Sequence, residues 1–390
     1  MNNLCVDIGY KSINHHGEEL CGDHVEIVEQ NENSSVIVLA DGLGSGVKAS
    51  ILSTLTSKII STMMAAGMPI DECVKTIAET LPVCSTRGIA YSTFTIMHLI
   101  DNEKMEMIQY DNPHVIMIRD GKNYSYPMTE LVIDGKQIYK TEIYIQKDDV
   151  FVAMSDGCPY AGDQKELNYN WSREDIIAFM EVMTMNGLTA KNLATMLVDE
   201  CDKLYAKKPT DDTTACVVKV RKRAPVNVLF GPPSDPDDVN RMLSLFFSKE
   251  GKKIICGGTT SNIAARYLGK KLEPLTNTEK TDIPPISKID GIDLVTEGVV
   301  TINRVVEHAK DYVGDNELYE EWYFKKNGAA LISQLLFEEA TDINFYVGKA
   351  INPAHQNPNL PVNFNLKMSL VEELTKYLRE MGKRVKVSYF

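Results

Sequence analysis

Four aspartates in the first half of the chain stand at the end of an apolar segment or beside glycine. They are Asp23, Asp41, Asp156 and Asp211. A single Asp-Gly pair is usually an ordinary turn, as we expect at Asp120-Gly121. Asp41 and Asp156 differ because a continuous run of β-branched and apolar residues precedes each of them, which predicts a carboxylate at the end of a buried strand.

Carboxylates that are brought together in this way repel one another unless a hard cation neutralises them. No His or Cys at metal-ligand spacing accompanies the acids, and oxygen ligands alone favour Mg²⁺ or Mn²⁺ over zinc. The eight cysteines form no CxxC pair. We therefore interpret them as buried free thiols in a reducing compartment.

Several motifs, taken in order, resemble the metal-dependent protein phosphatases of the stage II sporulation E type. The resemblance covers roughly residues 4–220, the size of an ordinary domain. Its motifs are Gly22-Asp23, Asp41-Gly42 followed by Gly44 and Gly46, Tyr91-Ser92-Thr93-Phe94, Asp111-Asn112-Pro113-His114, Arg119-Asp120-Gly121, Ser155-Asp156-Gly157 and Asp211-Asp212-Thr213-Thr214.

This resemblance implies a β-sandwich flanked by helices, a centre of two Mn²⁺ or Mg²⁺ ions, and hydrolysis of phosphoserine or phosphothreonine in a protein by a metal-bridged hydroxide. It makes Asp41 the bridging ligand and the carbonyl of Gly42 a further ligand. The other carboxylate ligands would be Asp23, Asp156 and Asp211, with Asp212 in a supporting role; Asp41, Asp156 and Asp211 would be the catalytic residues. No protein nucleophile is required, so Cys21 is interpreted as a buried thiol.

One departure concerns the phosphate-binding Arg of the broader type 2C group, which has no counterpart between His15 and Asp23. Basal activity would then be low until a partner or a conformational change organises the site. A phosphorylated antagonist in sigma-factor regulation fits the resemblance as substrate, and a homodimer would suit the family. The alternative is a catalytically weak module that senses a phosphoprotein or a small ligand with the same folds.

The elements that must position these acids alternate between strands and helices up to about residue 220. Strands are predicted over 36–40, 91–100, 104–110, 115–119, 138–145, 150–154 and 215–220, and a helix over 48–66. The pattern indicates antiparallel sheets with helices outside, an α+β phosphatase domain over 1–222.

A basic stretch ending at Pro225 is typical of a linker, and a regular strand–helix rhythm follows it over 226–390. We expect strands over 226–230, 253–256, 292–295, 343–347 and 385–389, and helices over 236–249, 261–268, 297–312, 325–339 and 369–381. This alternation predicts a smaller α/β domain with a mostly parallel, doubly wound sheet. Its role would be regulatory or ligand-binding, because no nucleophile–base pattern indicates a second enzyme.

The glycine-rich segment after the second of these strands is a candidate anion site. Gly257, Gly258, Thr259, Thr260 and Ser261 offer N–H groups and hydroxyls at a helix N-terminus, which suits a small anionic ligand. A tight strand-to-helix turn with Thr or Ser as N-cap explains the segment equally well.

The net charge of the chain is −13. Through Arg223 there are 21 Lys and Arg against 32 Asp and Glu, giving −11, and the remainder holds 20 against 22, giving −2. This acidity argues against a nucleic-acid partner. We find no secretory signal and no apolar stretch of membrane-spanning length, so we expect a cytoplasmic protein without a membrane partner.

Overall fold

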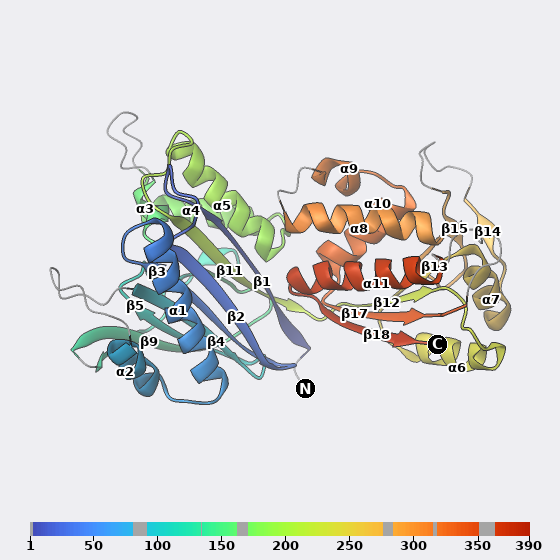
Figure 1. Cartoon of the computed structure of the whole chain (residues 1–390), viewed down its shortest axis with the longest axis horizontal. Coiled ribbons are helices and arrows are strands. Elements are labelled where there is room, and N and C mark those ends of the chain that lie inside the picture. The colour runs from blue at the N-terminus through green and yellow to red at the C-terminus, as the bar shows by residue number, and fades with distance from the viewer. Residues whose placement is uncertain are drawn as a thin grey trace. The chain divides into compact units, whose positions relative to one another are not determined.

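The computed structural model describes residues 3–80, 92–133, 135–161, 171–275, 284–314, 318–350 and 363–390. The chain divides into two compact units, Met1–Lys222 and Arg223–Phe390, and no described sheet is shared between them (Figure 1). Tyr91 of the phosphatase-like motifs lies outside the described residues. Within the described ranges, no helix is both long and apolar enough to cross a membrane.

Two antiparallel sheets make up the first unit. Their described strands follow the orders β1-β11-β10-β6-β7 and β2-β3-β4-β5-β9-β8. The strands are β1 (Leu4–Ile13), β2 (Asp23–Asn31), β3 (Ser34–Gly42), β4 (Ser92–Ile100), β5 (Lys104–Tyr110), β6 (Ile116–Arg119), β7 (Lys122–Asn123), β8 (Thr129–Ile133), β9 (Lys136–Tyr144), β10 (Val150–Met154) and β11 (Thr213–Lys222).

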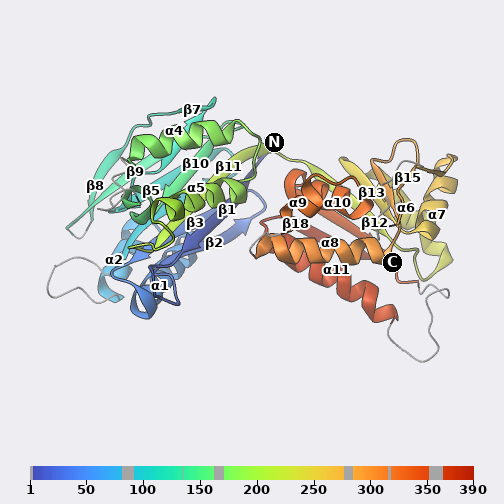
Figure 2. The same ribbon diagram turned by 90° about the horizontal axis from the view of Figure 1, so that it is seen from above.

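The inner faces of these sheets form one buried cluster, which includes Ile37 and Met97 from one sheet and Phe151 and Val218 from the other. Helices cover the outer faces (Figure 2). They are α1 (Gly46–Ala65) and α2 (Ile70–Thr80) on the sheet of β3, and α4 (Arg173–Thr184) and α5 (Ala190–Leu204) on the sheet of β10, with the short α3 (Gly157–Tyr160) after β10. Both faces of β3 and β10 are therefore covered, which explains why their sequences are continuously apolar.

The second unit is built on a mixed sheet whose described strands follow the order β14-β15-β16-β13-β12-β17-β18. The strands β12 (Pro225–Phe230), β13 (Lys252–Cys256), β16 (Leu294–Thr296), β17 (Asp342–Val347) and β18 (Arg384–Tyr389) are mutually parallel. The short strands β14 (Glu273–Pro274) and β15 (Ser287–Lys288) extend one edge in antiparallel fashion. The order reverses at β12, as in doubly wound sheets.

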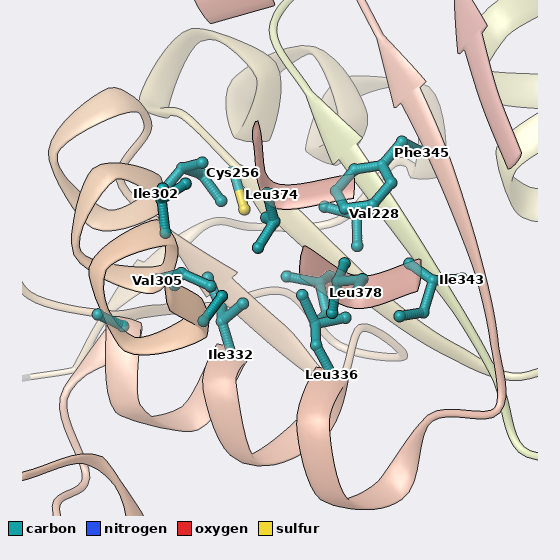
Figure 3. Packing of buried hydrophobic residues seen from close by; sticks show 14 of the residues in the cluster. Val228, Cys256, Ile302, Val305, Ile332, Leu336, Ile343, Phe345, Leu374 and Leu378 are labelled. Carbon is teal, nitrogen blue, oxygen red and sulfur yellow. The ribbon is translucent and has the colours of Figure 1, made fainter. Parts of the chain in front are cut away.

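Helices pack on both faces of this sheet. The cluster in Figure 3 joins sheet residues such as Val228 and Phe345 to Ile302, Leu336 and Leu374. Ile302 belongs to α8 (Val299–Val313), Leu336 to the π-helix η2 (Gln334–Glu339) and Leu374 to α11 (Asn363–Glu380). The same part of the chain also forms α9 (Tyr319–Tyr323) and α10 (Gly328–Ser333). The 3-10 helix η1 (Pro236–Asp238) leads into α6 (Val239–Ser248), which packs with α7 (Gly258–Leu268) on the opposite face.

The predicted fold class is confirmed for both units: α+β with a sandwich flanked by helices, then a smaller α/β unit. Element bounds differ in places. The helix predicted over 325–339 begins at Gly328 because the Asn327 side chain caps it, accepting the Ala330 N–H at 2.9 Å. Its last six residues are a π-helix.

Candidate metal centre

Asp23 and Asp41 lie directly opposite each other on the neighbouring strands β2 and β3. Opposite residues of an antiparallel pair project to the same face of the sheet. The backbone fixes this register, because the Gly42 N–H donates to the Gly22 carbonyl at 3.1 Å. The Ser92 hydroxyl donates to the Asp41 carbonyl at 2.8 Å. The carboxylates of Asp23 and Asp41 are thus held at one end of the β2–β3 strand pair.

The other acids come from the ends of β10 and β11 in the second sheet. Asp156 stands two residues after β10, and Asp211 and Asp212 immediately precede β11. Hydrogen bonds between Ser155 and Thr214 hold these two connections together, with N···O distances of 3.0 and 2.9 Å. A Cβ on Gly157 would lie 2.3 Å from the Asp212 carbonyl oxygen, so only glycine permits this approach.

Asp212 links the two sheets. Its Oδ1 accepts the His15 backbone N–H at 3.0 Å, and its Oδ2 would be 2.6 Å from a Cβ on Gly22. Because Gly22 immediately precedes Asp23, the carboxylate of Asp212 reaches the start of β2. The structure therefore gathers all five sequence-predicted acids where the strand ends of the two sheets meet.

The acids influence one another electrostatically. Burial, followed by repulsion from Asp23, Asp156, Asp211 and Asp212, raises the pKa of Asp41 to about 9. Burial also raises the pKa of Asp211 to about 6, with Asp156 as the next cause, and raises the pKa of Asp156. A group of acids with upward shifts of this kind favours binding of positive charge.

Burial raises the pKa of Asp23 to about 7, although the nearby hydroxyls of Ser155 and Thr214 lower it. The same hydroxyls also join neighbouring segments, because Ser155 Oγ accepts the Thr214 N–H and Thr214 Oγ1 donates to Ser12 Oγ at 2.7 Å. Both oxygens of Asp23, like Oδ2 of Asp212, are buried and accept no hydrogen bond.

Buried carboxylate oxygens without donors suit a hard divalent cation, which prefers oxygen ligands. The residue types and these oxygens therefore fit the implied Mn²⁺ or Mg²⁺. As the side chains lie, however, the described residues contain no group of three or more His, Cys, Asp or Glu that could hold a metal ion. The acids are close enough to interact but do not yet form a coordination shell.

Two neighbouring residues complete the site. Burial, then repulsion by Asp23, raises the pKa of the half-buried Cys21 thiol, which disfavours a thiolate nucleophile. Asp111 was assigned no role by sequence, yet it is one of the acids that raise the pKa of Asp156. It follows β5 with a left-handed φ of 56°, and the available sequence signal was its position in a polar turn after an apolar strand.

In the second unit, the five residues of the candidate anion site lie at the start of α7. Ser261 Oγ donates to the Gly257 carbonyl at 2.9 Å, Thr260 is buried and Thr259 is exposed. Both carboxylate oxygens of Glu297 would be 3.4 Å from a Cβ on Gly258. An external anion would have to share this position with Glu297 or displace it.

Comparison with known proteins identifies relatives of the first unit. Residues 31–221 match the family model for stage II sporulation protein E (SpoIIE). The stage II sporulation protein E of Priestia megaterium is 20% identical over 225 residues, which cover 56% of this chain and 37% of that protein. The chain therefore spans well under half the length of this curated relative.

Two solved structures are also similar. The PP2C phosphatase domain of SpoIIE from Bacillus subtilis, solved with a fragment of its regulatory domain, is 20% identical with a TM-score of 0.47, covering 57% of this chain and 65% of that one. The catalytic domain of the serine/threonine protein phosphatase PstP, in complex with two manganese ions, is 15% identical with a TM-score of 0.38, covering 56% and 100%.

Proposed function

We propose that the first unit, which belongs to the stage II sporulation E family of metal-dependent protein phosphatases, hydrolyses phosphoserine or phosphothreonine in a partner protein. One observation carries the proposal: five mutually interacting acids from two sheets meet at one place, and three of their oxygens are buried without a donor. That arrangement costs free energy unless positive charge compensates it.

In this proposal Asp41, the Gly42 carbonyl, Asp23, Asp156 and Asp211 hold two Mn²⁺ or Mg²⁺ ions. Such a pair of ions supplies an activated water at neutral pH and neutralises the phosphoryl oxygens during in-line attack. The chain's own part is to fix the ligands in register, through the β2–β3 pairing and the Ser155–Thr214 hydrogen bonds. Cys21, with its raised pKa, takes no part as a nucleophile.

The substrate class proposed is a phosphorylated protein, with a sigma-factor antagonist as the candidate that suits the family. Because no Arg stands between His15 and Asp23, binding of the phosphoryl group would depend mainly on the metal ions. Basal turnover would therefore be low without a partner. The second candidate, a sensing module with little catalysis, is favoured only by this missing Arg.

The test is release of phosphate from a phosphoserine protein by the intact chain, with and without Mn²⁺. Asp41→Asn and Asp156→Asn should each lower kcat/KM by about 10²-fold or more, since each removes a charge from the centre. Asp148→Asn is the matched control: Asp148 is exposed, pairs with Lys147 and has a left-handed φ of 70° that asparagine also tolerates. Metal-independent release, or equal activity in all four proteins, would contradict the proposal.

For the second unit we propose a regulatory role through a small anion or a protein partner. The support is a mostly parallel sheet whose strand ends lead into the α7 N-terminus. Calorimetric titration of a nucleotide into the metal-free chain tests the anion, and the absence of binding heat would contradict it.

A further inference from the structure

Asp212 is placed differently from the neighbouring Asp211, although both precede β11. Its side chain is only 3% exposed, whereas Asp211 is half-buried. One oxygen of Asp211 accepts the Asp212 N–H at 2.9 Å. Asp212 thus carries the more deeply buried carboxylate of the two.

The two oxygens of Asp212 have different surroundings. Oδ1 accepts the His15 N–H, which fixes the segment before β2 to the start of β11. Oδ2 is buried, accepts no hydrogen bond, and lies toward the position where Gly22 lacks a side chain. If Asp212 served only as the structural acceptor for the His15 N–H, Oδ1 alone would be enough.

Asp23, the residue after Gly22, has a carboxylate in a similar environment. It is 5% exposed and neither of its oxygens accepts a hydrogen bond. Two buried carboxylates with three unmatched oxygens between them are strongly unfavourable as uncompensated charges, and one divalent cation bound between them would compensate both. No Lys or Arg is paired with either of them among the ion pairs of the described residues.

We infer that Asp212 is itself a ligand of the metal centre, binding a divalent cation through Oδ2 beside Asp23 while Oδ1 stays on His15. This inference rests on the proposed function, since it concerns the same centre. It changes the role of Asp212 from a supporting residue to a direct oxygen ligand, in keeping with the ligand preference of Mn²⁺ and Mg²⁺.

The substitution Asp212→Asn separates the structural role of Asp212 from its role as a metal ligand. Asparagine keeps a carbonyl oxygen for the His15 N–H but replaces the other carboxylate oxygen with an amide nitrogen, which cannot bind a cation. The metal-free variant should keep its thermal midpoint, because the His15 N–H keeps its acceptor. If Asp212 were only structural, the lost charge would weaken manganese binding, but the number of ions bound would stay the same.

The experiment is calorimetric titration of Mn²⁺ into the intact chain without substrate, for the wild type, Asp212→Asn and the control Asp148→Asn. We expect Asp212→Asn to bind one manganese ion fewer than the wild type, a change in stoichiometry that loss of a supporting charge alone would not produce, while the control binds like the wild type. Wild-type stoichiometry in Asp212→Asn, with or without weaker affinity, would overturn the inference alone.

A wild type that binds no manganese would instead overturn the proposed metal centre and this inference with it. If Asp212→Asn fails to fold, anomalous diffraction from manganese in wild-type crystals decides. A manganese peak at direct coordination distance, about 2.0–2.6 Å, from an oxygen of Asp212 supports the inference. Peaks that contact only the other acids overturn it.

Discussion

A buried carboxylate at neutral pH needs either a proton or a cation, and Asp41 and Asp23 show this most strongly. Burial raises their pKa values to about 9 and about 7, from an ordinary value of 3.8. Without metal, the folded chain therefore retains protons that the unfolded chain has released. Stability must then decrease as pH rises, because the unfolded state binds fewer protons than the native state.

This predicts a pH dependence that metal removes. In EDTA, the free energy of unfolding should fall between about pH 6 and about pH 8, within the window that opens at the unfolded pKa of Asp and closes near the folded pKa of Asp41. Asp41→Asn should flatten this slope, and Mn²⁺ should stabilise the wild type more at the higher pH because the cation replaces the protons. Urea denaturation at several pH values measures this free energy of unfolding. The same dependence on pH in the wild type and in Asp41→Asn would contradict the assignment of the raised pKa to Asp41.

At the scale of elements, the strand ends bring the acids together, and close backbone approaches hold the ends in place. The connection after β10 meets the connection before β11 at Gly157, where a Cβ would lie 2.3 Å from a main-chain oxygen of Asp212. The main chain cannot move aside as a flexible side chain can. The distance between Asp156 and Asp212 therefore depends on this glycine.

Gly157→Ala should separate these two connections. We expect a loss of about 1–3 kcal/mol in stability, the usual cost of overpacking, together with weaker manganese binding. Gly258→Ala is the control, because Gly258 begins the helix α7 in the second unit and its Cβ would meet nothing closer than 3.4 Å. Thermal denaturation and metal titration measure both effects, and wild-type behaviour of Gly157→Ala would refute the role given to this contact.

Much of this arrangement could be predicted from sequence because β3 and β10 are covered on both faces and are therefore continuously apolar. The ends of these apolar runs indicated directly that Asp41 and Asp156 are carboxylates at the ends of buried strands. The strands β1 and β2 are only partly buried and have mixed sequences, so they were not predicted as strands. The contact between His15 and Asp212 joins residues 197 positions apart, and no local pattern encodes it. The ligand set itself stays a prediction.

At the scale of the whole molecule, the net charge and the match to the family model concern the same part of the chain. The residues through Arg223 carry a net charge of −11 out of −13, and five of their acids lie at the candidate centre. Divalent cations there would offset part of this excess. The second unit, nearly neutral at −2, has a confirmed α/β fold but a role that rests on the proposal alone.

The central claim is that this acidic centre binds two divalent cations. Its most direct test is a crystal of the intact chain grown with Mn²⁺, with diffraction recorded at the manganese absorption edge. The account predicts two anomalous peaks among Asp23, Asp41, Asp156, Asp211 and Asp212, with Asp41 in contact with both. Saturating Mn²⁺ without a peak among these acids, or with peaks only elsewhere on the molecule, would contradict it.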